Sequence, residues 1–420
     1  TAAVYVFVQY RLRALQKEKQ VLEEKVRERT AEIEAKNKEL ERLSIVARET
    51  GNVIIIMDDK GKLEWVNYSF EKVNDITLEE LKKLKGESIF EISNNPEIKN
   101  IIDTCMREKR SIVYESKNIL RDGRVIWESS TLTPIYDESG NLRKLIIIDT
   151  DVTEQKRSEE IIRQKNKDIT DSIEYAKKIQ TSILPPLAEV KDALPRSFVM
   201  YMQKDIVSGD FYWFARKGDE AIIAVVDCTG HGVPGAFMSL IGNNILNQVV
   251  NEHEITEPAA ILDGLNKGVI NALYHNAGAD TSKDGMDAAI CTINLRTKTV
   301  QFAGAMRPLY IFGKNGFEEI KGDKMPIGTR EGDREHAIKF TTHTIKAGNG
   351  EKFYISSDGY ADQFGGGSGK KMMTKNFKQI LERIREMDFE EQKKELVRYH
   401  REWKGDYEQV DDILVIGFSI

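Results

Sequence analysis

The sequence predicts a multidomain protein: an α-helical coiled coil, a small α+β domain, a helical linker and a layered α/β sandwich. Three observations support this. The chain has 420 residues, which is too long for one ordinary domain. Two charge-rich stretches lack glycine and proline and carry apolar residues at heptad spacing. Elsewhere, short apolar runs alternate with turns that contain glycine and aspartate. We place the four parts at residues 1–44, 45–153, 154–185 and 186–420.

Composition excludes several classes of function. The formal net charge of -6 gives no case for a nucleic-acid partner. The 3 cysteines are far apart and form no CxxC pair, so neither a disulfide framework nor a zinc site is expected. A reducing compartment fits this pattern, and we expect a cytoplasmic protein.

The first ten residues, TAAVYVFVQY, are apolar, and a positively charged run follows them. Ten residues cannot span a bilayer, which needs about 20. One interpretation is the frayed start of a hydrophobic helix. The other is the end of a transmembrane helix cut on its N-terminal side, which would attach the protein to the inner membrane. In that case Arg11, Arg13, Lys17 and Lys19 would lie on the cytoplasmic side.

Residues 10–46 predict one continuous helix with a heptad pattern. A solvated single helix is one interpretation, but the sustained heptads favour a parallel dimeric coiled coil. The core positions are Leu12, Lys19, Val26, Ile33 and Leu40 at a, and Leu15, Leu22, Arg29, Lys36 and Leu43 at d.

Residues 152–184 predict a second long helix, in which Ile162, Ile169, Ala176 and Ile183 repeat every seven residues. It ends before Pro185, because proline cannot continue a helix. We interpret it either as a plain linker or as a rigid helical pair that transmits a signal.

Between the helices, two strands, several short helical pieces and three further strands predict an antiparallel α+β domain. The opening I-I-x-D-x-x-G-x-L-x-x-V-N, the Gly-Arg pair after Asp122 and the closing D-V-T-E-Q-K-R resemble a PAS domain. All six histidines lie at position 231 or later, so none can bind haem here. Cys105 lacks the Asn-Cys-Arg context of flavin-photoadduct PAS domains. A small-molecule sensor and a ligandless dimerisation module both stay open.

Strands and helices alternate from about residue 187, which favours an α/β/β/α sandwich. We expect strands at 196–203, 209–216, 221–228, 288–297, 299–306, 308–313, 336–345, 351–358 and 412–420, and helices at 235–252, 258–276, 375–387 and 390–403.

Aspartates stand at four of these strand ends: Asp210, Asp227, Asp358 and the pair Asp411–Asp412. Each aspartate by itself could be an ordinary turn residue. Together they would repel one another unless cations offset their charge, and carboxylate oxygens suit hard divalent cations.

The segments A-K-K-I-Q-T-S-I-L-P-P, S-G-D-F-Y-W, D-C-T-G-H-G-V-P-G-A-F-M-S, S-S-D-G-Y-A-D-Q and V-D-D-I-L-V-I resemble the SpoIIE/RsbU-type branch of the metal-dependent (type 2C, PPM) serine/threonine phosphatases. The resemblance implies two Mn²⁺ or Mg²⁺ ions. Asp210 would bind one ion, and Asp227 would bridge both, with help from the backbone carbonyl of Cys228. Asp358 and Asp411 would hold the second ion. A water activated by the ion pair would attack phosphorus.

The chain departs from the family pattern at several positions. Trp213 stands where many members carry a second aspartate. A G-H-x-P segment is replaced by Gly304-Ala305-Met306-Arg307-Pro308, so the general acid is unassigned. His231 could donate a proton or simply pack in its turn. Arg307 could contact phosphate or be a surface residue. Asp287 is a weaker candidate for an auxiliary acid.

We therefore expect a sensor-regulated phosphoprotein phosphatase. By the same resemblance, its substrate would be a phosphorylated anti-sigma-factor antagonist of the STAS type. A parallel homodimer would form through the coiled coil, PAS domain and linker helices. The alternative is a non-catalytic scaffold that binds phosphoprotein. A histidine kinase is disfavoured, because the 152–184 helix contains no histidine.

Overall fold

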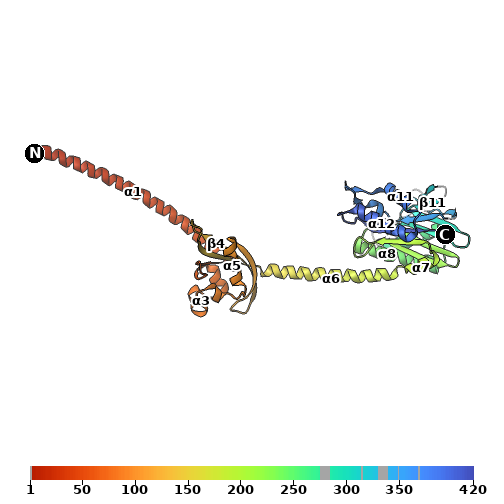
Figure 1. Ribbon diagram of the computed structural model, residues 1–420, viewed down its shortest axis with the longest axis horizontal. Coiled ribbons are helices and arrows are strands. Elements are labelled where there is room, and N and C mark those ends of the chain that lie inside the picture. Colours follow the sequence, from red (N-terminus) through yellow and green to blue (C-terminus); the bar gives the residue numbers. More distant parts are fainter. Residues whose placement is uncertain (1, 275–283, 314–315, 330–338, 349, 368) are drawn as a thin grey trace. The chain divides into compact units, whose positions relative to one another are not determined.

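The computed structural model describes residues 2–274, 284–313, 316–329, 339–348, 350–367 and 369–420. They form two compact units, residues 1–165 and 166–420. The multidomain architecture expected from the sequence is confirmed: a long N-terminal helix, an α+β domain and a two-sheet domain (Figure 1). No helix in the described part of the chain is long and apolar enough to cross a membrane.

The first unit begins with the helix α1 (Ala2–Glu49). Its five-stranded antiparallel sheet has the order β2-β1-β5-β4-β3. The strands are β1 (Val53–Met57), β2 (Leu63–Val66), β3 (Ile112–Ile119), β4 (Val125–Tyr136) and β5 (Leu142–Asp151), and the helices between β2 and β3 are α2 (Tyr68–Asn74), α3 (Leu78–Lys85), α4 (Ile89–Ile92) and α5 (Ile98–Glu108).

Asn67, the asparagine of the V-N motif, links three elements of this unit through hydrogen bonds. The Asn67 side-chain oxygen caps α2 by accepting from the Phe70 N–H, and it also accepts from the Ile54 N–H of β1. Its amide nitrogen donates to the carbonyls of Ala47 and Asn52. One buried side chain therefore joins the end of α1, the first strand and the first short helix.

The linker helix α6 (Thr153–Ile183) ends two residues before Pro185, as the sequence predicts. The second unit continues with α7 (Leu187–Ala193), β6 (Ser197–Met202), β7 (Phe211–Lys217), β8 (Glu220–Cys228), α8 (Gly232–Leu246), a π-helix (Asn247–Glu252), α9 (Pro258–Tyr274), β9 (Met286–Asn294), β10 (Thr299–Ala305), β11 (Leu309–Gly313), β12 (Gly316–Ile320), β13 (His343–Lys346), β14 (Lys352–Ser356), α10 (Gly359–Asp362), β15 (Phe364–Gly365), β16 (Lys370–Lys371), α11 (Met373–Ile384), α12 (Phe389–Lys404) and β17 (Ile413–Phe418).

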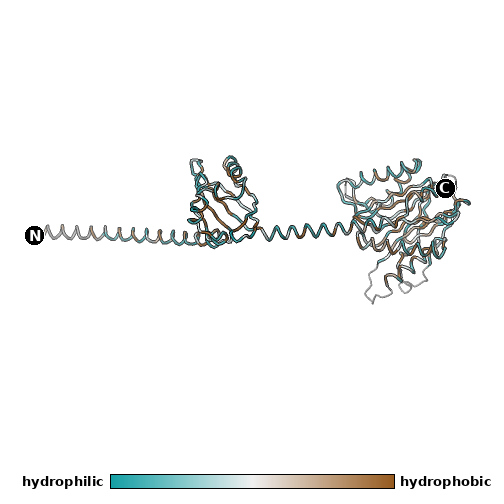
Figure 2. Tube along the Cα trace, turned by 90° about the horizontal axis from the view of Figure 1, so that it is seen from below, coloured by the Kyte–Doolittle hydropathy of each residue, from teal (hydrophilic) through white to brown (hydrophobic). Residues whose placement is uncertain are grey.

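Two five-stranded antiparallel sheets form the centre of this unit, in the orders β13-β10-β9-β8-β7 and β12-β11-β14-β17-β6. One buried apolar cluster lies between them, with Ile223 and Val225 from the first sheet and Phe353 and Leu414 from the second. A second cluster joins the first sheet to α8 and α9, and a third joins the second sheet to α11 and α12. The predicted α/β/β/α layering is confirmed. In each unit the hydrophobic positions concentrate in the strands (Figure 2).

The strand expected at 336–345 is shorter than predicted. Only His343–Lys346 forms a strand, β13, and residues 336–338 lie outside the described residues. β12 was not expected from the sequence, and it pairs with β11. Its residues, Gly316–Ile320, are partly exposed at the sheet edge and lack an apolar run.

Candidate active site

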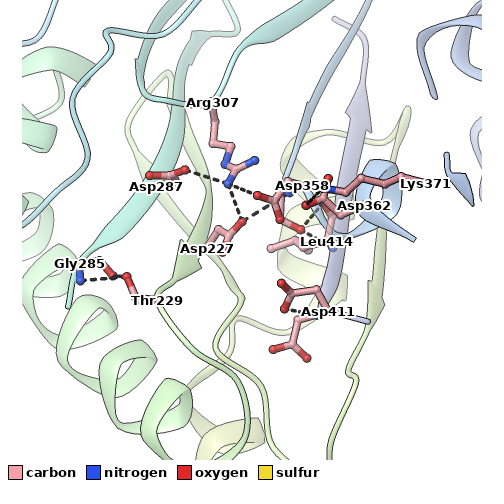
Figure 3. A network of polar contacts seen from close by, with 12 residues as sticks. Asp227, Thr229, Gly285, Asp287, Arg307, Asp358, Asp362, Lys371, Asp411 and Leu414 are labelled. Carbon is pink, nitrogen blue, oxygen red and sulfur yellow. Dashed lines mark hydrogen bonds and ion pairs between the residues drawn. The ribbon is translucent and has the colours of Figure 1, made fainter. Parts of the chain in front are cut away.

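The strand-end aspartates converge where ends of the two sheets meet (Figure 3). Asp227 lies at the end of β8 and Asp287 near the start of β9, and the strand register places these two residues directly opposite each other. From the second sheet, Asp358 follows β14 and Asp411 precedes β17. Like charges directly opposite in a sheet are destabilising, so this arrangement requires a compensating positive charge.

Arg307, between β10 and β11, supplies that charge. Its Nη2 atom lies 3.0 Å from Asp227 Oδ2, 2.8 Å from Asp287 Oδ2 and 2.7 Å from Asp358 Oδ2. The arginine side chain is only 15% exposed. Figure 3 shows the guanidinium pointing into the group of three carboxylates. The interpretation of Arg307 as a plain surface residue is therefore wrong.

Burial dominates the electrostatics of the bridging candidate, Asp227. It raises the pKa of Asp227 to about 7, although the Arg307 charge opposes the shift. Burial also raises the pKa of Asp287, again against Arg307, and the pKa of Asp411, to which the neighbouring Asp358 charge adds. Even with the arginine present, the described residues leave an excess of negative charge at this site.

Asp210 is the most enclosed of the predicted ligands, with 2% of the residue exposed. Burial, reinforced by the charge of Asp227, raises the pKa of Asp210 well above its ordinary value. Its Oδ2 atom is buried and has no hydrogen-bond partner among the described residues. An unsatisfied buried carboxylate oxygen is costly, and a bound cation is one means of satisfying it.

Glycines allow the Asp210 and Asp227 loops to approach closely. A Cβ atom on Gly209 would lie 2.5 Å from the Gly230 carbonyl oxygen, and one on Gly235 would lie 2.4 Å from the same oxygen. The glycines of the S-G-D and G-V-P-G motifs are thus explained by backbone contact between the two loops, which brings both aspartates to one site.

Asp412, next to Asp411, braces the same loop. Its carboxylate accepts hydrogen bonds from the Lys204 N–H and the Gly209 N–H, each at 2.8 Å. Asp411 instead accepts from the Asp412 N–H, and it is only half-buried. Asp412 is therefore committed to holding the backbone, and Asp411 is the member of the pair with an accessible carboxylate.

Gln180 of α6 contacts the loop that precedes Asp210. Its Nε2 donates to the Ser208 carbonyl at 2.6 Å and to the Ser239 hydroxyl at 2.8 Å, and its Oε1 accepts from the Ser208 N–H. Gln180 is 1% exposed. Gln180 ends the A-K-K-I-Q motif, and no role was expected for it from the sequence. The one available sign of a role for Gln180 was a polar residue at a buried position of a charge-rich helix.

Two other predicted site residues behave differently. His231 is half-exposed, and its Nδ1 lies 2.6 Å from Asp205 Oδ2. No hydrogen bond in the described part of the chain joins it to the four strand-end aspartates. The Cys228 thiol is buried, and burial raises its pKa well above the ordinary value, so the side chain is not a reactive nucleophile.

The predicted ligands do not form a ready-made metal site. Among the described residues, no group of three or more histidine, cysteine, aspartate or glutamate side chains is arranged to hold one ion. Arg307 occupies an oxygen atom of Asp227 and one of Asp358. The ligand set of Asp210, Asp227, the Cys228 carbonyl, Asp358 and Asp411 stays a prediction.

Comparison with known proteins identifies the domains. Residues 217–420 match the family model for stage II sporulation protein E (SpoIIE), and residues 51–154 match a PAS domain model. The solved SiaA-PP2C domain of Pseudomonas aeruginosa is 31% identical, with a TM-score of 0.54, and the match covers 61% of this chain and 98% of that chain. The chain belongs to the SpoIIE-type PP2C (PPM) phosphatase family.

Two further solved structures resemble this PP2C-type chain. They are the phosphatase domain with a regulatory fragment of SpoIIE from Bacillus subtilis (13% identity, TM-score 0.41, 78% of this chain and 75% of that chain) and the RsbU and RsbW domains of Rv1364c from Mycobacterium tuberculosis (14%, 0.41, 53% and 60%). A search of curated proteins gave no match.

Proposed function

We propose that the chain is a phosphatase that hydrolyses phosphoserine or phosphothreonine on a partner protein, with two Mn²⁺ or Mg²⁺ ions bound among its strand-end aspartates. The observation that carries the proposal is the buried, unpartnered Oδ2 atom of Asp210 beside a group of carboxylates whose negative charge exceeds the charge of Arg307. Carboxylates of this kind fit hard divalent cations.

The residues that would hold the ions are Asp210, Asp227, Asp358 and Asp411, with the Cys228 carbonyl. When bound, the ions would offset the carboxylate charge and lower the pKa of an attacking water. Asp412 fixes the backbone at Gly209, and so holds Asp210 beside Asp227. No nucleophilic side chain is needed, which agrees with the inert thiol of Cys228.

We propose that Arg307 binds the phosphoryl group. Its Nη2 atom donates to Asp287 and Asp358 and pairs with Asp227, while its Nε–H is buried without a partner in the described residues. Guanidinium groups pair well with phosphate oxygens. Cations that neutralise Asp227 and Asp358 would weaken these ion pairs and release Arg307 toward a substrate.

The proposed substrate is a phosphorylated STAS-type anti-sigma-factor antagonist, carried over from the SpoIIE/RsbU resemblance. We also propose a parallel homodimer. On α1, Leu22, Val26, Ile33 and Leu40 have relative exposures of 63%, 58%, 56% and 62%, and on α6 Ile169 is 58% exposed. Apolar residues at heptad spacing are buried when two such helices pair.

The test is phosphate release from an aryl phosphate and from a phosphoserine STAS protein, with and without Mn²⁺. We expect metal-dependent turnover that Asp227→Asn reduces by more than the ~10–100-fold typical for residues that merely orient metal ligands. Asp219→Asn is the matched control, because Asp219 is an exposed aspartate that pairs with Arg296. Full activity in Asp227→Asn would reject the two-metal mechanism.

One observation favours the alternative, a non-catalytic phosphoprotein-binding scaffold. Arg307 already supplies part of the counter-charge that cations would provide. A scaffold would bind the phosphorylated partner without releasing phosphate, and its binding would not depend on Mn²⁺. Measuring binding and turnover on the same phosphoprotein distinguishes the two functions.

A further inference from the structure

The sheet of the first unit carries polar residues at inward-facing positions. Along β4 the buried alternate residues are Ile126, Glu128, Ser130 and Leu132. Alternate residues of a strand share one face, so a carboxylate and a hydroxyl stand in a row that is otherwise apolar. Polar residues at buried positions of an otherwise apolar strand face are more typical of a functional site than of a hydrophobic core.

Strand register gathers further polar groups around these two residues. Ser130 lies opposite Tyr114 of β3 and Asp149 of β5, and Glu128 lies opposite Ser116. Residues two apart on neighbouring strands lie about 7–8 Å from each other on the same face. The two carboxylates, Glu128 and Asp149, are therefore close neighbours on one inner surface of the sheet.

These residues line a cavity of about 230 Å³. The other walls are mixed: one side is apolar and includes Val53, Ile55, Phe70 and Ile147, and asparagines such as Asn74, Asn94 and Asn95 also line the cavity. An engineered apolar cavity of ~150 Å³ accommodates benzene, whereas pockets for drug-sized ligands reach ~300–1,000 Å³. The cavity therefore suits a small organic molecule, a benzene ring with a short side chain being about the right size.

The cavity holds two carboxyl groups and, among the described residues, no buried cation to pair with them. Neither Glu128 nor Asp149 has a salt-bridge partner within the described residues. The Asn118 amide donates to Glu128, and the Oδ1 atom of Asp149 is buried without a hydrogen-bond partner there. Burial raises the pKa of Glu128 to about 7 and that of Asp149 to about 6, and the charge of Asp149 adds to the shift of Glu128.

The basic residues of the cavity lie at its exposed edge. Lys85 and Arg121 are exposed, and Arg121 donates to the Asp75 carbonyl. A buried carboxylate is expensive unless a cation pairs with it. Among the described residues, the cavity interior therefore has no cation of its own. A bound molecule that carries a positive charge would supply it.

We propose that this cavity binds a small organic amine, with its ammonium group against Glu128 and Asp149 and its hydrocarbon body against the apolar wall. A metal ion fits less well, because it would leave that wall uncovered and find only two carboxylates. The inference is independent of the proposed phosphatase activity.

The test uses calorimetric titration of the full chain with three molecules of matched size: phenethylamine, 2-phenylethanol and phenylacetate. We expect phenethylamine to bind at least about tenfold more tightly than the alcohol, as a charge-assisted hydrogen bond implies, and phenylacetate not to bind. Equal or tighter binding of the alcohol or the acid would overturn the proposal. So would the absence of phenethylamine binding, or binding of Mg²⁺ or Ca²⁺ that requires Glu128.

Variants locate the site. Glu128→Gln and Asp149→Asn each keep the side-chain shape and remove the charge, so each should weaken phenethylamine binding by about tenfold or more. Glu115→Gln is the control, because Glu115 faces outward from β3 and pairs with Lys156. Unchanged affinity in both cavity variants would place the amine elsewhere and reject the site. The ligand series on the unmodified chain decides the question even where a variant folds poorly.

Discussion

Replacing Arg307 with methionine tests whether the arginine is the internal counter-ion of the acidic site. Methionine keeps much of the length of the side chain but removes the charge that three carboxylates share at 2.7–3.0 Å. Removing one partner of a buried ion pair typically costs 3–5 kcal/mol. At roughly 2–4 °C per kcal/mol for a unit of this size, the metal-free protein should unfold about 6–20 °C lower.

The same substitution should strengthen metal binding. In Arg307→Met the oxygens of Asp227 and Asp358 are no longer held by the guanidinium, so Mn²⁺ should bind at least about tenfold more tightly and restore most of the lost stability. Thermal unfolding with and without Mn²⁺, together with calorimetric titration, measures both effects. Arg216→Met is the control: Arg216 is 50% exposed and pairs with Asp192 at 3.3 Å, so less than about 1 kcal/mol is expected. An unchanged metal-free melting temperature, or weaker Mn²⁺ binding, would refute the counter-ion role.

Three other predictions concern separate parts of the chain. Because the pKa of Glu128 is raised to about 7, the folded state takes up a proton between about pH 4.5 and 7 that the unfolded state does not, so stability should fall by about 3 kcal/mol across this window as pH rises. Hydrogen exchange of β4 and β5 peptides should show this fall, and Glu128→Gln should reduce it to the part that the raised pKa of Asp149 contributes below about pH 6. Gln180→Ala removes the partners of both the Ser208 N–H and its carbonyl, and should lower phosphatase turnover several-fold, whereas Gln155→Ala, at an exposed site on the same helix, should not. Ile33→Asp should shift the mass measured by light scattering from dimer toward monomer, and a wild-type monomer would contradict the coiled coil.

Local patterns were enough to predict most of the architecture. The apolar runs of β7 and β8, the proline after Ile183 and the alternation in β4 each act over a few residues, and the structure has the expected elements. β12 was missed because its exposed edge position requires no apolar pattern. The turn residues Gly209 and Gly235 marked loops in the sequence, but the contact between those loops depends on the completed sheets.

The partners of charged residues were less predictable. Strand positions indicated that Asp227 and Asp358 would lie at sheet ends, yet the sequence could not show that Arg307 would reach both. Arg307 lies 80 positions after Asp227 (307 - 227) and 51 positions before Asp358 (358 - 307). Contacts over such separations depend on the register of the completed sheets. His231 was predicted from a turn, and its pairing with Asp205 follows from a loop conformation that no short-range pattern encodes.

The register that sets Asp227 opposite Asp287 makes a nearby cation necessary, and the chain supplies one from the segment where the family pattern has a histidine. The guanidinium would repel a divalent ion bound at the same oxygen atoms of Asp227 and Asp358, so the two cations would compete for these carboxylates. Under the proposed mechanism, metal loading would therefore displace Arg307 or use the other oxygens of these carboxylates. Asp210 Oδ2 is buried and has no partner among the described residues, so a bound cation would satisfy it without competing with Arg307. We therefore expect Arg307 to lower the metal affinity of this site, and we propose that the arginine, once freed by loading, would be available to the phosphoryl group.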